Sequence, residues 1–213
     1  MWENCFYVGG SDDGVIDADG VPVGAAVCWE LMRTRTARRL RGRIDLLVGG
    51  SAWWSIPEWP PAAVRRRLEA SNARTATSLA PAMARAVGAP VAHAALCGPV
   101  RSAMPLSPGL GYDGHYEGGA CIVDGHGGVL AWRSARDGAG IAVADVEPGR
   151  TPPTLDADAG FWLHRRGVLT AATWTYQNAH GRRWYRRHAL GRPAEERPLE
   201  LLAPRAGVPE PAL

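Results

Sequence analysis

A cysteine stands at the point where an apolar segment gives way to an expected helix. Residues 21–28 (VPVGAAVC) are a short run of β-branched and small apolar residues, which predicts a buried strand. Cys28 therefore falls at a strand-to-helix turn, the geometry of a nucleophile elbow. Backbone N–H groups after such a turn, beginning at Trp29, can stabilise an oxyanion, and a helix N-terminus favours thiolate. A cysteine nucleophile for acyl transfer has these requirements.

Such a nucleophile also needs a group that carries protons. Glu30 follows Cys28 by two residues, and Glu3 lies upstream in an aromatic, partly apolar segment where its carboxylate could be desolvated. Glu117 is a further candidate for the base. Lysine has no part in the chemistry of this polypeptide alone, because all 24 Lys and Arg residues are Arg.

Composition and charge exclude several other classes of function. The net charge of +3 is too small to indicate a nucleic-acid or membrane partner. No uninterrupted apolar run approaches the ~18 residues of a membrane span. The four cysteines are widely spaced without a CxxC pair, which argues against a disulfide framework and a zinc ribbon. The N-terminal residues lack the pattern of a signal peptide, so we expect a cytoplasmic protein.

Strands and helices are expected to alternate over the first 150 residues, which predicts an α/β domain with a mixed sheet. Expected strands cover residues 15–17, 21–28, 44–48, 90–96 and 141–146, with a hairpin at 120–123 and 129–133. Helices are expected at 29–41 and from Pro60 to Gly88, with a kink or break at Pro81, and residues 98–118 are expected to be a loop. Beyond this domain (1–150) we expect a partly helical extension (151–190) and a disordered tail (191–213).

The residues around Cys28 resemble the nucleophile motif of the nitrilase, or carbon–nitrogen hydrolase, superfamily. In that family a G-x-x-x-C-W-E string carries the catalytic cysteine, and residues 24–30 here are GAAVCWE. Three other parts of the chain resemble the family in order and spacing: residues 1–4 with 9–14, residues 44–53, and residues 122–124 with 127–131. The resemblance covers roughly residues 1 to 150.

The resemblance implies an α-β-β-α sandwich with mixed sheets and a Glu-Lys-Cys catalytic set supported by a second Glu. Carried over by position, Cys28 is the nucleophile that attacks a nitrile or amide carbon, through a thioimidate or acyl-enzyme. Glu3 matches the supporting catalytic Glu, Trp29 would supply an oxyanion N–H, and Glu30 would organise the pocket. The family's Lys and base Glu lie before the position of Glu3. We therefore expect a member incomplete at its N-terminus that lacks both.

Other arrangements of residues are weaker candidates for a site. Trp53 and Trp54 could line a substrate pocket or act as interface anchors. His115 and Glu117 have no known metal-ligand spacing, and His93 on an apolar strand is expected to be a core residue, so we expect no metal. The basic and aromatic run at 182–188 suits a helix with Arg on its exposed face better than a nucleic-acid site.

The sequence thus predicts a hydrolase of small nitriles or amides that needs no cofactor and forms a homo-oligomer, without nucleic-acid or membrane partners. The alternative is a catalytically inactive, truncated relative that acts as a binding or assembly subunit. A reactive Cys28 with a depressed pKa would favour chemistry, and an inert Cys28 would favour the assembly role.

Overall fold

A computed structural model describes residues 12–58, 61–103, 111–164 and 168–188 of the chain. The chain divides into two compact units. One unit comprises residues 12–102 and 111–165, and contains the sheet and every described site residue discussed below. The other unit contains one described helix.

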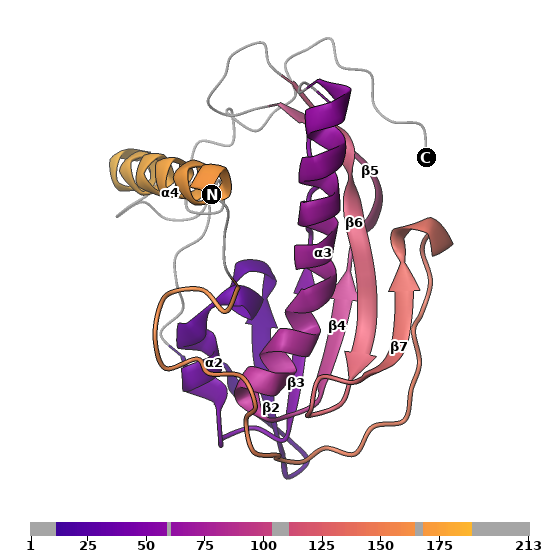
Figure 1. Cartoon of the computed structure of the whole chain (residues 1–213). Coiled ribbons are helices and arrows are strands. Elements are labelled where there is room, and N and C mark those ends of the chain that lie inside the picture. Colours follow the sequence, from indigo (N-terminus) through magenta and orange to yellow (C-terminus); the bar gives the residue numbers. More distant parts are fainter. Residues whose placement is uncertain (1–11, 59–60, 104–110, 165–167, 189–213) are drawn as a thin grey trace. The chain divides into compact units, whose positions relative to one another are not determined.

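The sheet unit contains seven strands and four helical segments in the described residues, and the second unit contains the last helix (Figure 1). In chain order the elements are β1 (Val15–Ala18), β2 (Val21–Val27), the 3-10 helix η1 (Cys28–Met32), α2 (Thr34–Leu40), β3 (Leu46–Ser51), α3 (Ala62–Val87), β4 (Val91–Ala95), β5 (Cys97–Ala103), β6 (Gly111–Val123), β7 (Val129–Ser134), the 3-10 helix η2 (Ala135–Asp137) and α4 (Val168–His188).

The sheet is mixed, as the sequence predicts. Its order is β1-β2-β3-β4-β6-β5, and β7 also pairs with β6. β2, β3 and β4 run parallel to one another, whereas β1, β6 and β7 are antiparallel to their neighbours. The parallel strands end at the same edge, so the segments after β2 and β3 lie side by side.

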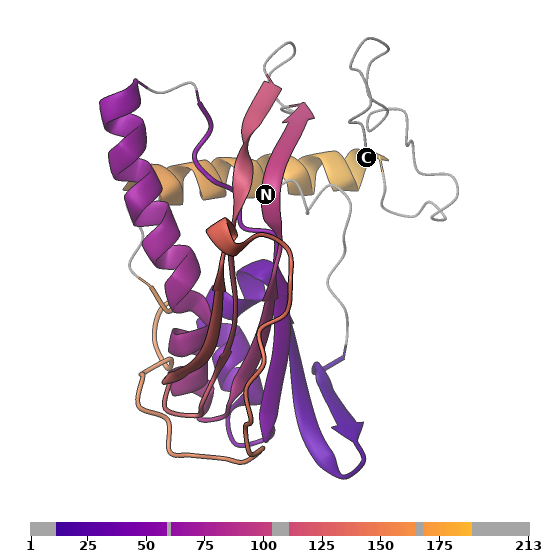
Figure 2. The same ribbon diagram turned by 90° about the vertical axis from the view of Figure 1, so that its right-hand side faces the viewer.

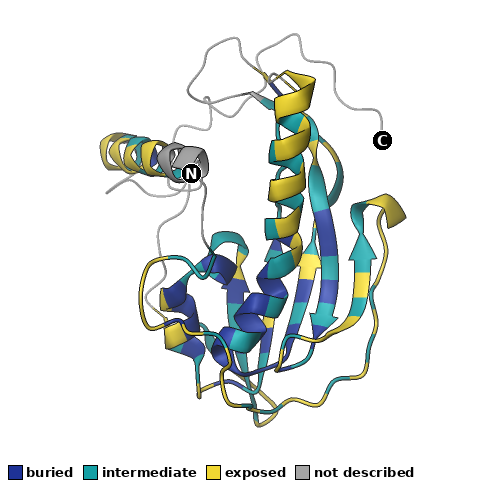
Figure 3. Ribbon diagram, in the orientation of Figure 1, coloured by how far each residue is buried: buried dark blue, intermediate teal, exposed yellow. Residues whose placement is uncertain are grey.

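Helices α2 and α3 pack on one face of this sheet, and Figure 2 shows α3 lying along that face. The core joins Leu40 of α2 and Met83 of α3 to Leu47 of β3 and Val91 of β4, all with no exposed surface. The C-terminal half of α3 is buried, whereas its N-terminal half is largely exposed (Figure 3). This half of the helix carries Glu69 and Asn72, which return in the description of the site.

The long helix confirms one boundary and corrects another expectation. Gly88 caps α3 with a left-handed φ of +75°, as its position after the helical pattern predicts. Pro81 neither splits the helix nor ends it, because α3 continues from Ala62 to Val87 with Pro81 inside. The neighbouring side chains Leu79 and Met83 are buried, and this packing outweighs the backbone hydrogen bond that proline cannot donate.

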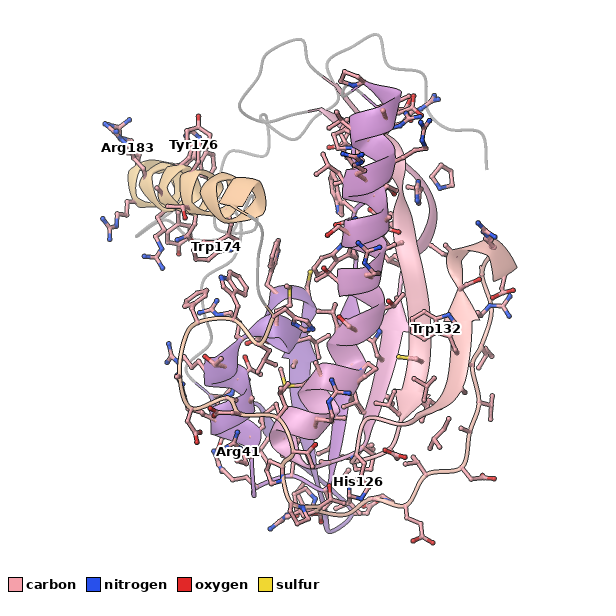
Figure 4. The ribbon with its side chains drawn as sticks, viewed as in Figure 1. Arg41, His126, Trp132, Trp174, Tyr176 and Arg183 are labelled. Carbon is pink, nitrogen blue, oxygen red and sulfur yellow. The ribbon has the colours of Figure 1, made fainter. Side chains whose placement is uncertain are left out.

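The loop expected at residues 98–118 is wrong where the structure describes it, since β5 and the first part of β6 occupy those positions. The many glycines in this segment predict a loop, but several of these glycines lie inside strand β6. Gly118 and Gly119 have φ values of +66° and +92° at an irregularity in the β6–β7 register. A Cβ on Gly119 would lie 2.9 Å from the ring of Trp132, which is labelled on β7 in Figure 4.

Three other sequence-based boundaries need correction. The helix expected at 29–41 divides into η1 and α2, because Arg33 is extended and forms a β-bridge with Trp162. The strand expected at 44–48 is shifted along the chain, because β3 starts at Leu46 and continues through Gly49 and Gly50 to Ser51. No strand forms at 141–146 in the described chain. Ile141 and Val143 are 83% and 79% exposed there, so the alternating apolar side chains bury no surface that would stabilise a strand.

The C-terminal helix is found where the sequence predicts one, as α4. Arg182, Arg183, Arg186 and Arg187 are exposed and Trp184 is half-buried, which fits the expected helix with a wet arginine face. The tail at 191–213 lies outside the described residues. Among the helices described, none combines the length and apolarity needed to cross a membrane.

His93 is a satisfied core residue, as expected from its place on an apolar strand. It is 5% exposed on β4, where its Nδ1 lies 3.2 Å from the Gly119 carbonyl oxygen and its Nε2 lies 3.0 Å from Ser51 Oγ. A carbonyl only accepts, so Nδ1–H donates to Gly119 and Nε2 accepts from the Ser51 hydroxyl. Burial lowers the pKa of His93 below its usual 6.5, which keeps the ring neutral.

This buried ring makes stability dependent on pH. The unfolded chain takes up a proton on His93 near its usual pKa while the folded chain does not, so the free energy of unfolding falls as pH drops below about 6.5. We expect urea denaturation between pH 8 and 5.5 to show a larger loss of stability for the wild type than for His93→Gln. Identical losses in the two proteins would show that His93 does not supply this dependence.

Candidate functional site

Cys28 has a left-handed backbone at the end of β2. Its φ is +52°, and Cys28 is one of two non-glycine residues in the described chain with a positive φ. Val27 before it is extended, with φ −118° and ψ 130°, and η1 begins at Cys28 itself. Strained backbone at a strand-to-helix turn is the signature of a nucleophile elbow, so the local geometry that the sequence predicts is present.

Glu30 closes this turn. Its Oε2 accepts a hydrogen bond of 3.1 Å from the backbone N–H of Val27, and its Oε1 lies 3.7 Å from Arg39 Nη2. Its backbone carbonyl accepts from the N–H of Arg33 at 3.1 Å. Glu30 therefore holds both sides of the elbow, which fits an organising role better than proton transfer.

Two apolar side chains and a glycine fix the elbow against the sheet. Leu31 and Met32 of η1 have no exposed surface. A Cβ on Gly49 of β3 would lie 2.5 Å from the Ala26 carbonyl oxygen and 3.3 Å from Leu31 Cδ2. Only a residue without a side chain lets the end of β2 and Leu31 approach β3 this closely.

Trp29 lies beside Trp53, one of the two expected pocket residues. The register pairs Val27 with Gly50, so the residues after β2 and after β3 leave the same edge of the sheet. The ring centroids of Trp29 and Trp53 are 5.8 Å apart, and the ring centroid of Trp162 also lies 5.8 Å from that of Trp29. Next to Cys28 there is thus an aromatic wall built from three segments of the chain.

Trp54 belongs to a different cluster from Trp53. Its ring lies 4.7 Å from Tyr112 and 6.2 Å from Tyr116, both on β6. Adjacent residues in extended chain point to opposite sides, so a single WW pair cannot line one wall. Of the two expected pocket residues, only Trp53 lies against Trp29, the residue next to Cys28.

A polar network that sequence reasoning missed continues from Trp53. Trp53 Nε1 donates to Asn72 Oδ1 at 2.9 Å, and Asn72 Nδ2 donates to the Trp54 carbonyl oxygen at 2.9 Å and to Glu117 Oε1 at 2.6 Å. Glu69 lies close enough to Glu117 to affect its ionisation. The available signal was the i, i+3 spacing of Glu69 and Asn72, which places both on one side of α3.

Glu117 is held in an unusual electrostatic setting. Burial raises the pKa of its carboxyl, the neighbouring Glu69 carboxylate raises it further, and the hydrogen bond from Asn72 opposes them, giving a pKa of about 7. The carboxyl is joined to the Cys28 region through Asn72, Trp53 and Trp29 in turn. The structure therefore places Glu117 beyond the aromatic wall.

The remaining expected residue, Glu3, lies outside the described residues. The other cysteines of the described chain are unlike Cys28. Cys121 is buried on β6, and burial raises the pKa of its thiol to about 11. Cys97, at the start of β5, is half-buried as Cys28 is, so exposure does not distinguish these two thiols. Cys28 alone among these three stands at a strained strand end.

Comparison with known proteins gives partial structural similarities. No protein-family model matches the chain, and no curated protein matches it. A carbon–nitrogen hydrolase from Helicobacter pylori is similar over 61% of this chain and 42% of its own, with a TM-score of 0.46 and 21% identity. An amidase from Nesterenkonia sp. is similar over 79% of this chain and 49% of its own, with a TM-score of 0.41 and 19% identity.

A third structure is that of Nit3 from Saccharomyces cerevisiae, a member of the nitrilase superfamily. It is similar over 58% of this chain and 37% of its own, with a TM-score of 0.40 and 16% identity. All three bear names from the superfamily that the sequence resembles. The chain spans less than half the length of each of these proteins.

Paired substitutions test the strained elbow. Glycine adopts a left-handed backbone without the steric cost that alanine has there, so Cys28→Gly should be more stable than Cys28→Ala by about 1 kcal/mol. At exposed Arg35 in α2 the order should reverse, with Arg35→Gly less stable than Arg35→Ala by up to about 1 kcal/mol. Chemical denaturation measures both pairs. A Cys28→Gly protein less stable than Cys28→Ala would contradict the elbow geometry.

Proposed function

We propose that Cys28 is the nucleophile of a carbon–nitrogen hydrolase that acts on small nitriles or amides. The observation that carries the proposal is the left-handed backbone of Cys28 at a strand end, with φ +52°. Backbone strain of this kind in a non-glycine residue is typical of functional sites, and a nucleophile elbow uses it to present the side chain outside the sheet.

The chemistry follows from the thiolate. With an amide, Cys28 Sγ forms a bond to the carbonyl carbon, the C–N bond breaks, and the nitrogen leaves as ammonia or an amine after taking up a proton. With a nitrile, Sγ adds to the carbon and the nitrogen takes up a proton, which gives a thioimidate. Water attacks the thioimidate carbon and the nitrogen leaves as ammonia, which gives the same acyl-enzyme as the amide does. In both routes water then attacks the acyl carbon, and the C–S bond breaks to release the acid and the thiol.

The residues around the elbow would have different roles in the reaction. The backbone N–H of Trp29 would donate to the oxyanion or to the nitrile nitrogen, and the indoles of Trp29 and Trp53 would form an apolar wall for a small substrate. Glu30 would fix the turn through Val27. Glu3 would support proton transfer, as its position in the motif implies.

The resemblance places the family's lysine and base glutamate before the position of Glu3. The 213-residue sequence contains no lysine, so a lysine at this site would have to come from outside the sequence. The loss of a single oxyanion donor costs about 10²–10³ in rate. We therefore propose that this chain forms the covalent adduct more readily than it completes turnover.

An assembly role is the second candidate, and the uncovered face of the sheet favours it. The register places Ile16, Val27 and Val48 on the face opposite α2 and α3. These side chains are 56%, 65% and 37% exposed. A row of exposed apolar side chains on a sheet is typical of an interaction surface, so a non-catalytic subunit remains the alternative.

Mass spectrometry of covalent adducts separates the two functions. We expect millimolar small nitriles to add their whole mass to the peptide that contains Cys28, and small amides to add their mass minus ammonia. Cys28→Ser should abolish the thiol adduct, whereas Cys97→Ser, which removes a half-buried thiol elsewhere, should keep it. Ammonia release measured in parallel reports turnover. Adducts that are absent, or equal on Cys28 and Cys97, would favour the assembly role.

A further inference from the structure

Three side chains that could bind a metal converge from a helix and a strand. Glu69 comes from α3, and His115 and Glu117 come from β6. One ligand atom from each lies within 4.8 Å of the other two, and His115 Nε2 is 3.5 Å from Glu69 Oε1. His115 and Glu117 are two residues apart on a strand, so their side chains share one face of β6.

Partners outside the cluster fix one oxygen of each carboxylate. Glu69 Oε2 accepts from the backbone N–H of Ile56 at 2.8 Å. Glu117 Oε1 accepts from Asn72 Nδ2 at 2.6 Å, and Asn72 is itself held by the indole of Trp53. Metal sites are typically built this way, because such outer hydrogen bonds orient the ligands before the ion binds.

The backbone of His115 is fixed as well. Its N–H donates to Ser55 Oγ at 3.0 Å, and its carbonyl oxygen accepts from the Ser55 N–H at 2.8 Å. All three ligands are thus positioned by contacts that leave one donor atom of each for the centre of the cluster.

The second oxygen of the Glu69 carboxylate, Oε1, lacks a hydrogen-bond donor among the described residues. Glu69 Oε1 is buried and accepts no hydrogen bond from the part of the chain that the structure describes. It lies beside His115 Nε2, and the Glu117 carboxyl is its other neighbour. Two carboxylates whose oxygens lie this close together repel each other unless a cation or a shared proton lies between them.

We propose that Glu69, His115 and Glu117 bind a divalent first-row transition-metal cation of the Zn²⁺ or Mn²⁺ type. One imidazole and two carboxylates are a typical donor set for such ions, whereas Mg²⁺ and Ca²⁺ prefer oxygen ligands alone. Around a tetrahedral ion with bonds of about 2.1 Å, ligand atoms lie about 3.4 Å apart, so ligand atoms up to 4.8 Å apart must approach one another by up to about 1.4 Å.

The ion would tie the N-terminal part of α3 to β6. This stretch of α3 is largely exposed, so few apolar contacts hold it, and Glu69 also reaches the segment after β3 through Ile56. His115 is half-exposed, which leaves a route for the ion and for water as a further ligand. The site does not depend on Cys28 or on the proposed hydrolysis.

Isothermal titration of the chelator-treated full chain with Zn²⁺ or Mn²⁺ tests the proposal. We expect one site per chain with a Kd of about 10 μM or tighter, and a rise in the melting temperature on binding. Mn²⁺ is the more selective probe, because thiolates bind it less well than they bind Zn²⁺.

Glu69→Gln, His115→Gln and Glu117→Gln should each weaken binding at least about tenfold, because each removes one ligand. His126→Gln is the matched control, since His126 is exposed in the turn between β6 and β7 (Figure 4) and should bind as the wild type does. Circular dichroism verifies that each variant folds. No binding below millimolar Mn²⁺, or equal binding by wild type and Glu117→Gln, would overturn the proposal. A proton shared between Glu69 and Glu117 would then explain the close approach of the two carboxyl groups. Such a result would not bear on the proposed function, because that function is tested separately by adduct formation at Cys28.

Discussion

The left-handed backbone of Cys28 is the constraint on which the site depends. Such a conformation costs a non-glycine residue about 1–2 kcal/mol. Fully burying Leu31 and Met32 next to it contributes about 1.5–3 kcal/mol each, so the packing of η1 outweighs the strain. Glu30 adds a hydrogen bond to Val27 across the turn. The elbow is thus held by the core beneath it, and Gly49 is the residue that lets the core come close enough.

From this elbow one continuous set of contacts reaches the far side of the site. Trp29 lies against Trp53, Trp53 donates to Asn72, and Asn72 donates to Glu117. The aromatic wall beside the nucleophile and the carboxylate cluster on α3 and β6 are therefore positioned by the same segment after β3. A change at the cluster that moved Asn72 would reach Trp53 directly, which gives the fold a physical link between two chemically different places.

The sequence predicts the parts of this arrangement that are local. A run of small apolar residues followed by CWE is enough to place Cys28 at a strand end, and Gly88 is enough to end α3. The parts built from distant residues are not predicted. Glu69 is 46 residues from His115 and 48 residues from Glu117 in the sequence. No helical or strand periodicity predicts a contact over such a separation. The loop expected at 98–118 fails because β6 uses glycines for a register irregularity and for contact with Trp132.

The central claim is that the elbow presents a reactive thiol, and competitive alkylation tests it most directly. A limiting amount of iodoacetamide at neutral pH, followed by mass spectrometry, gives the relative rate at each cysteine of the folded protein. The account predicts that Cys28 reacts about tenfold or more faster than Cys97, although both thiols are half-buried. Cys121 should stay unmodified, since burial raises the pKa of its thiol to about 11. Equal rates at Cys28 and Cys97 would contradict an activated nucleophile and leave the elbow a structural feature alone.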